Sequence, residues 1–256
     1  MNPKRSFLAL LLAVVLIGCS KPPEPRHIVI LVDVSGSIER DALAQAFKAI
    51  DELVSHLQRG DRITVIPILG DAQAEASGRI LRFEVPVNRQ AYDSDLRHFR
   101  VLLKNTLDNT QAEAVAHPGS KTDILGSIAL AEQEFHTASE HPAQQLVILS
   151  DFIQESDEVN FKTNKCLANA TVAKDFATRL MNNHGTDLKG IPVYLGALKS
   201  NEYSNLLRSR RYAIQAFWIE YFEASHAHPR FVVDGPGLLS GSVAASIDGA
   251  PEFQSP

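Results

Sequence analysis

Residues 28–37 read IVILVDVSGS, and this stretch decides the fold. It begins with an uninterrupted run of Ile, Val and Leu, which is typical of a strand buried on both faces of a parallel sheet. Residues 39–58 follow with apolar side chains at spacings of three and four, the pattern of an amphipathic helix. A buried strand that leads through a polar turn into a helix predicts the first unit of an α/β domain.

The rest of the chain continues this alternation of apolar runs and amphipathic stretches. Strands are predicted at 62–69, 79–87, 145–152, 191–198 and 231–233, and helices at 92–115, 123–139, 168–183 and 203–224. Pro86 cannot donate to a strand ladder, so the strand that contains it is expected at or near a sheet edge. We therefore expect a doubly wound α/β fold, with a mostly parallel central sheet flanked by helices.

The predicted helix at 203–224 is strongly amphipathic. One side carries aromatic residues that include Phe217 and Trp218, which we interpret as core packing rather than as a cofactor site. Its arginines are expected on the solvated face: Arg208, Arg210 and Arg211.

The composition is that of an ordinary globular domain. The chain has 256 residues, of which 45% are hydrophobic and 21% charged, so collagen-like and wholly disordered classes are excluded. The formal net charge of −5 argues against a non-specific nucleic-acid binder, because such proteins usually carry a basic patch. Two cysteines are too few for a disulfide scaffold. We expect no nucleic-acid partner.

Residues 1–18 have the pattern of a secretory signal peptide. Lys4 and Arg5 precede an uncharged stretch of 13 residues rich in Leu, Ala and Val, which is too short to span a bilayer as a helix. This stretch leads into LIGC at residues 16–19, which resembles the lipobox of bacterial lipoproteins. The resemblance implies that Cys19 is lipidated and becomes the first residue of the mature chain.

Lipidation would attach the protein to the cell envelope. Several acyl chains on one cysteine give stable membrane anchoring. Ser20 follows Cys19 where an Asp would favour retention in the inner membrane, so the outer membrane is expected, with the protein facing the periplasm. The expected organisation is a lipidated Cys and Pro-rich tether at 19–26, a folded domain at 27–233 and a flexible tail at 234–256.

The turn after the first strand carries oxygen ligands at alternating positions. Asp33, Ser35 and Ser37 offer one carboxylate and two hydroxyls at the carboxyl end of a strand, where open α/β sheets bind ligands. Small oxygen ligands on one turn can converge on a hard cation such as Mg²⁺. The alternative is that Ser35 or Ser37 caps the next helix, although a cap needs only one such residue.

This pattern resembles the metal-ion-dependent adhesion site of von Willebrand factor A (VWA) domains. The family has Asp-x-Ser-x-Ser after its first strand, a Thr on a later loop and an Asp at the end of its fourth strand. Residues 119–124 and 148–151 match the two later segments, and the resemblance covers residues 27–233. It implies that Mg²⁺ or Mn²⁺ is bound by Asp33, Ser35, Ser37, Thr122 and Asp151.

The resemblance also implies how such a site would work. The hydroxyls would bind the cation directly, and the two aspartates would act largely through water, so that the metal stays electrophilic. An open coordination position would then accept an acidic residue of a partner protein. An envelope-anchored protein of this kind would serve in protein–protein binding or adhesion, and we expect no enzymatic activity.

Three features depart from the family pattern and bear on the ligand rather than on metal binding. Phe152 stands where the family often has Gly, and Lys121 lies beside the threonine where Gly is usual. Residues 153–167 form a longer loop than a minimal domain needs. That loop carries three acidic residues, Glu155, Asp157 and Glu158.

Other functions remain open as alternatives. A magnesium-dependent phosphatase of the haloacid-dehalogenase type also has an Asp after its first strand, but it needs a second acid where this chain has Ser35. A serine hydrolase needs Gly-x-Ser-x-Gly, and Asp33 occupies the first of those positions. The remaining alternative is a scaffold domain that binds no metal.

Overall fold

The computed structural model describes residues 24–72, 74, 78–86, 89–116, 121–137, 143–163 and 165–232. The predicted signal peptide, the predicted lipidation site Cys19 and the predicted tail at 234–256 lie outside these residues. Within the described part of the chain, no helix is long and apolar enough to cross a membrane.

Six strands form one sheet, in the order β3-β2-β1-β4-β5-β6. The strands are β1 (Arg26–Asp33), β2 (Arg62–Ile68), β3 (Leu81–Glu84), β4 (Ala143–Ser150), β5 (Pro192–Ala197) and β6 (His228–Val232). All neighbours pair in parallel except β2 and β3, which pair antiparallel. The predicted fold class is confirmed, and the strand near Pro86 lies at a sheet edge as expected.

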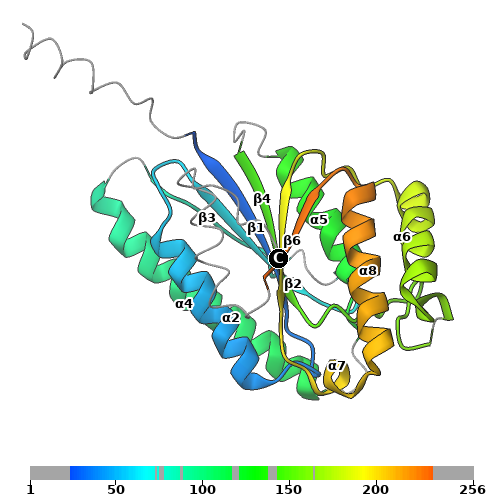
Figure 1. Ribbon diagram of the computed structural model, residues 1–256. Helices are drawn as coiled ribbons and strands as arrows, with labels where there is room; N and C mark the ends of the chain where they lie inside the picture. The colour runs from blue at the N-terminus through cyan, green and yellow to red at the C-terminus, as the bar shows by residue number, and fades with distance from the viewer. Residues whose placement is uncertain are drawn as a thin grey trace, which may run out of the picture.

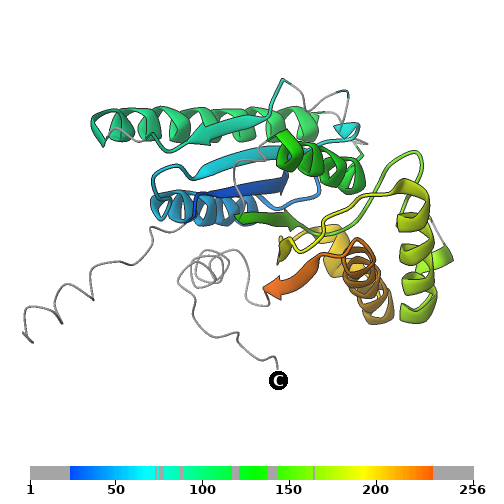
Figure 2. The ribbon, with the colours of Figure 1, turned by 90° about the horizontal axis from the view of Figure 1, so that it is seen from above.

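Helices cover both faces of this sheet. They are α2 (Arg40–Ser55), α4 (Arg89–Ala116), α5 (Ile124–Thr137), the 3₁₀ turn η1 (Lys165–Leu167), α6 (Ala170–His184), α7 (Asn201–Asn205) and α8 (Arg208–Ala224). Figure 1 shows α2 and α4 on one side of the sheet and α5, α6 and α8 on the other. Figure 2 shows α4 and β3 at one end of the molecule and α6, α8 and β6 at the opposite end.

The predicted helix at 203–224 is divided into two helices. The Ser200 side chain accepts a hydrogen bond from the Tyr203 N–H at 3.0 Å and starts α7, which ends at Asn205. Leu206 and Leu207 then adopt extended ψ angles of 145° and 146° before α8 begins. Apolar periodicity does not reveal this break, because both leucines fit the helical pattern of the sequence.

The first strand begins at Arg26, one residue before the predicted start of the folded domain and inside the predicted tether. Arg26 is buried, and its backbone N–H donates to Asp61 Oδ1 at 2.9 Å. Its guanidinium also pairs with Asp61, which accepts the Gln58 N–H at 2.7 Å as well. A buried charge needs such a partner, and this one lies 35 residues away in the chain.

The sheet order places a topological switch point where the site is expected. Connections leave β1 and β4 in opposite directions along the sheet, and ligands of doubly wound folds bind outside the carboxyl ends of the strands at such a switch point. The β1–β4 register pairs Val32 with Leu149. Asp33 and Asp151, which end these two segments, are thereby brought to the same place.

Candidate metal centre

Two buried aspartates meet at the switch point of the sheet. Asp33 is the last residue of β1 and is fully buried, and Asp151 follows β4 with only 2% of its surface exposed. The Ser150 hydroxyl donates to Asp33 Oδ2 at 2.7 Å across the two strands. The strand pairing therefore places both carboxylates, as the sequence pattern predicted.

The two serines of the first turn lie next to Asp33. The Ser35 N–H donates to Asp33 Oδ1 at 3.0 Å, and the hydroxyl oxygens of Ser35 and Ser37 are 2.9 Å apart. Neither serine caps the next helix, because Glu39 is the N-cap residue of α2 and makes no side-chain cap bond. Both hydroxyls therefore lie at the carboxyl edge of the sheet without serving as a helix cap.

Backbone contacts position Thr122 at the same edge. Its N–H donates to the Glu155 carbonyl at 3.0 Å, and its own carbonyl accepts the Glu155 N–H at 2.7 Å. The next residue, Asp123, donates its N–H to the Leu69 carbonyl at 2.8 Å, directly after β2. Thr122 is buried in this arrangement. The loop after β4 and the end of β2 thus hold the threonine between them.

The fully buried side chain of Gln154 links the segment after β4 to the start of α5. Gln154 Oε1 accepts the N–H groups of Ile124 and Leu125 at 2.8 and 3.1 Å, and its Nε2 donates to Asp123 Oδ1 at 3.0 Å. Asp123 Oδ1 also accepts the Gly126 N–H at 3.0 Å. A Cβ on Gly126 would lie 2.1 Å from Asp123 Oδ2, so this first turn of α5 requires glycine.

Burial makes the charged form of both aspartates unfavourable. Desolvation raises the pKa of Asp33, although hydrogen bonds from Ser150 and Ser35 oppose the shift. Desolvation, followed by the charge of Asp33, raises the pKa of Asp151 to about 7, with Ser200 and the Ile153 N–H opposing. Two neighbouring carboxylates in a buried site cannot both ionise cheaply without a positive charge beside them.

The donor set fits a small, hard cation. Asp151 Oδ1 accepts the Ile153 N–H at 2.9 Å, whereas its buried Oδ2 has no partner of normal hydrogen-bond geometry within the described residues. In the same part of the chain, no cluster of three or more His, Cys, Asp or Glu side chains could hold a metal. A site here would therefore depend on hydroxyl oxygens, which suit Mg²⁺ and Mn²⁺.

The charges of the long loop are balanced locally. Lys162 pairs with Glu155 and lies 2.7 Å from Glu202 at the start of α7. Lys121, the residue beside the threonine, pairs with Asp157. These ion pairs neutralise both lysines locally, so that Lys121 beside the threonine is not an uncompensated positive charge.

Phe152 adopts the backbone conformation that usually calls for glycine. Its φ angle is 63°, in the left-handed region, which costs energy for a residue with a side chain. Its carbonyl accepts the indole N–H of Trp218 at 3.0 Å, and its ring packs against Trp218 and Phe231. This packing holds the turn after β4, which carries Asp151, against the aromatic core.

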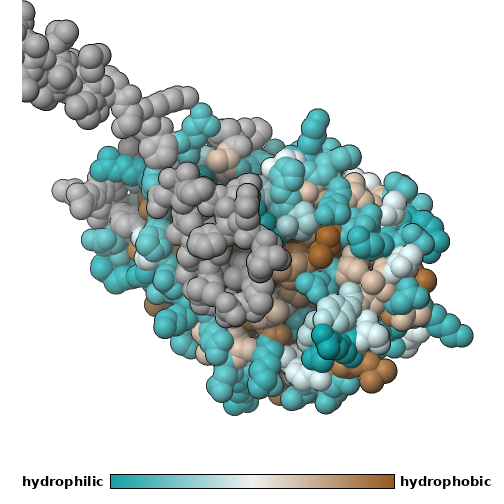
Figure 3. Space-filling view, viewed as in Figure 1, coloured by the Kyte–Doolittle hydropathy of each residue, from teal (hydrophilic) through white to brown (hydrophobic). Residues whose placement is uncertain are grey.

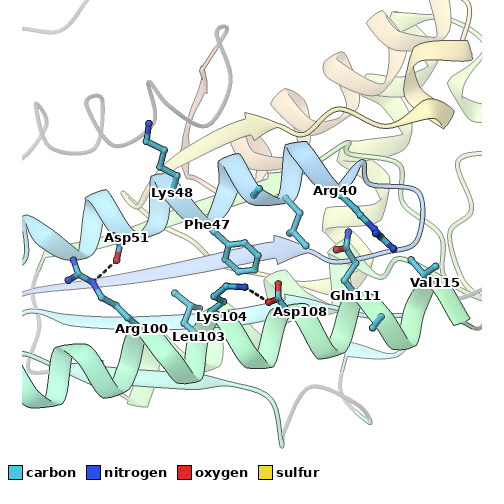
Figure 4. A pocket seen from close by; sticks show the side chains of 13 residues that line it. Arg40, Phe47, Lys48, Asp51, Arg100, Leu103, Lys104, Asp108, Gln111 and Val115 are labelled. Carbon is cyan, nitrogen blue, oxygen red and sulfur yellow. Dashed lines mark hydrogen bonds and ion pairs between the residues drawn. The ribbon is translucent and has the colours of Figure 1, made fainter.

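A hollow of about 800 Å³ lies away from this centre, between α2 and α4. Figure 4 shows Phe47 and Leu103 at its apolar floor, with ion pairs between Asp51 and Arg100 and between Lys104 and Asp108 along it. It includes none of the five predicted ligands.

No protein-family model and no curated protein matches this chain. Similar solved structures include a von Willebrand factor type A protein from Catenulispora acidiphila, with 17% identity and a TM-score of 0.44, over 88% of this chain and 42% of that one. The pilus adhesin SpaC from Lactobacillus rhamnosus GG, in its open conformation, shows 9% identity and a TM-score of 0.51, over 89% of this chain and 30% of that one. The chain thus spans less than half of each solved chain, and the likeness concerns the fold alone.

The buried hydrogen bonds of Gln154 predict that this residue contributes to the stability of the fold. Gln154→Leu would leave two amide donors and one carboxylate without their buried partner, so we expect a loss of about 2–4 kcal/mol in the free energy of unfolding. Urea unfolding measures this loss. The control is Gln144→Leu, which removes a single half-buried bond to the Phe135 carbonyl at 3.1 Å and should cost about 1 kcal/mol. Equal losses in the free energy of unfolding of the two variants would contradict this role of Gln154.

The raised pKa of Asp151 predicts a pH dependence in metal-free protein. Unfolded Asp ionises near its ordinary pKa of 3.8, whereas the folded protein keeps this proton up to about pH 7. The free energy of unfolding should therefore fall as the pH rises through this window. Asp151→Asn should reduce the slope, measured by urea unfolding in EDTA at a series of pH values. An unchanged slope in the variant would argue against a raised Asp151 pKa.

Proposed function

We propose that this protein binds a divalent cation and uses it to bind a partner protein, in the manner of VWA domains. The cation would be Mg²⁺ or Mn²⁺, held by the set Asp33, Ser35, Ser37, Thr122 and Asp151. The observation that carries this proposal is the pair of buried carboxylates at the switch point, beside two hydroxyls that cap no helix. Within the described residues, Asp151 Oδ2 has no partner of normal hydrogen-bond geometry.

The chain's own residues would prepare the site in three ways. Asp33 is fixed in place because the Ser35 N–H and the Ser150 hydroxyl each hold one of its oxygens. Asp151 keeps one oxygen for the site, since only the other accepts the Ile153 N–H. The hydroxyls of Ser35 and Ser37 add neutral ligands. When bound, the cation supplies a coordination position for a carboxylate of the partner.

A binding role is supported over a catalytic one by the residue at position 35. A phosphatase of the type considered above needs an acid there, and the chain has a serine whose hydroxyl lies 2.9 Å from that of Ser37. Phosphatase and esterase assays of the purified protein, with and without Mg²⁺, test this part of the proposal. Turnover that depends on Mg²⁺ and on Asp33 would favour the enzyme.

We further propose that the protein is anchored by lipid on Cys19 to the cell envelope, in the outer membrane and facing the periplasm. The support is the lipobox-like LIGC at residues 16–19 after an apolar stretch of signal-peptide length. The adhesion role of SpaC belongs to that protein, and an adhesive or protein-binding role for this chain remains part of the proposal.

Metal binding should require Asp33. Asp33→Asn keeps the size of the side chain but removes a charge, so we expect Mg²⁺ and Mn²⁺ binding by isothermal titration calorimetry to fall by at least about tenfold. The fold should persist, because the replaced carboxylate is unfavourable in the metal-free protein. The matched control is Asp108→Asn, an acid of α4 that pairs with Lys104 away from this centre and should leave binding unchanged. Equal metal affinity in both variants would contradict the role of Asp33 as a metal ligand.

Membrane anchoring should require Cys19. In a bacterial host, the protein is expected to incorporate radiolabelled palmitate, and Cys19→Ser should abolish the labelling because the thiol that carries the acyl chains is gone. Ser20→Ala serves as the control. Palmitate labelling of Cys19→Ser equal to that of the unchanged protein would reject the lipid anchor.

A further inference from the structure

Asp151 borders a second feature besides the metal centre. A cavity of about 180 Å³ opens beside it, at the carboxyl ends of β4 and β5 and against α8. Its apolar walls are formed by Phe152, Ala197, Leu198, Ile214, Trp218 and Phe231. One carboxylate is thus shared between the candidate cation site and an apolar space.

The cavity has the size of one apolar side chain. An apolar protein cavity of about 150 Å³ is known to accommodate benzene. Trp218, which is fully buried, is one of its lining residues. Tyr203 and Gln215 are the polar residues at its edge, besides Asp151.

A basic and aromatic surface continues from that edge. Tyr203 and Gln215 also line a shallow hollow together with Arg208, Arg211 and Tyr212. Arg208 donates to the Tyr212 hydroxyl at 2.9 Å, and neither Arg208 nor Arg211 has an acidic partner within the described ranges. This surface therefore offers two cations to an anionic ligand.

Exposed apolar side chains lie on the same surface. Leu207 is 77% exposed and Tyr212 is 51% exposed, on the segment where α7 passes into α8. Figure 3 shows apolar and polar surface side by side at this end of the molecule, where Figure 1 places α7 and the start of α8. Exposed apolar side chains next to arginines that have no acidic partner are typical of a protein-binding surface.

We propose that the cavity and the Arg208–Arg211 surface together select an extended acidic peptide segment of the partner protein. One carboxylate of the segment binds the cation, a neighbouring aromatic or branched aliphatic side chain fills the cavity, and a further acidic residue faces the two arginines. Because Asp151 belongs to both sites, the first two groups come from residues close together in the partner's sequence. This inference rests on the proposed function and specifies its partner.

Synthetic peptides test this selection directly. The probes are nonapeptides of Gly and Ser that carry one Asp, followed by Phe or Ala, and then by Glu or Gln. Fluorescence anisotropy with the full chain in mild detergent measures their dissociation constants in Mg²⁺ and in EDTA. The Phe peptides should bind about 10- to 100-fold more tightly than the Ala peptides. Glu should improve binding about two- to fivefold over Gln.

Substitutions in the protein test whether the cavity causes the preference for Phe and whether the arginine surface causes the preference for Glu. Ala197 is a small, exposed residue of the cavity wall, so Ala197→Leu should narrow the cavity and remove the preference for Phe. Binding of the Ala peptides in Mg²⁺ should remain. Arg211→Gln should remove the preference for Glu, whereas Arg97→Gln, an exposed arginine on α4 at the other end of the sheet, should change nothing.

The outcomes separate this inference from the proposed function. Equal binding of Phe and Ala peptides in Mg²⁺ would overturn the cavity's role and leave the cation-dependent function standing. A Phe preference that survives Ala197→Leu would also overturn it. Binding that is the same in Mg²⁺ and in EDTA would contradict the proposed function itself, and failure of every peptide to bind would reject an acidic peptide as the partner segment.

Discussion

The repulsion between Asp33 and Asp151 is the constraint on which the rest of the site depends. The two strands that carry them are buried neighbours, and their register leaves both carboxylates in a place that water scarcely reaches. Burial alone raises the pKa of each, and their proximity raises that of Asp151 further. Two such acids do not favour the stability of the domain. Their arrangement therefore points to a ligand of positive charge.

The surrounding elements hold these groups in place through contacts that stabilise the loops. Gln154 binds the start of α5 to the segment after β4, and the Glu155 backbone pairs with that of Thr122. Phe152 accepts a strained backbone angle, and its contacts with Trp218 compensate for that strain. The same turn that carries Asp151 is thus continuous with the aromatic core under α8. Phe152 is therefore the residue that connects Trp218 in this core to the turn of Asp151.

Much of this architecture could be predicted from the sequence because apolar periodicity reports strands and helices directly. The run at residues 28–32 is buried on both faces, and the edge position of the strand near Pro86 is also correct. The convergence of Asp33 and Asp151 followed from the rule for switch points. These features depend on local patterns together with general rules of sheet topology.

What could not be predicted depends on contacts between distant parts of the chain. The Arg26–Asp61 pair moves the start of β1, and the break at Leu206 and Leu207 is invisible to periodicity. The linking role of Gln154 had only a weak signal in the sequence. That signal was a single amide residue after the apolar stretch that ends in Phe152 and Ile153. The arginines at 208 and 211 were expected on a solvated face, and only the structure places them beside a cavity that Asp151 borders.

The central claim is that the two buried aspartates and the nearby hydroxyls form one cation site. Crystals grown with Mn²⁺ and measured near the manganese absorption edge test it most directly. The account predicts a single strong anomalous difference peak between the side chains of Asp33, Ser35, Ser37, Thr122 and Asp151. A well-ordered centre with no anomalous peak, at a Mn²⁺ concentration that saturates calorimetric binding, would contradict it.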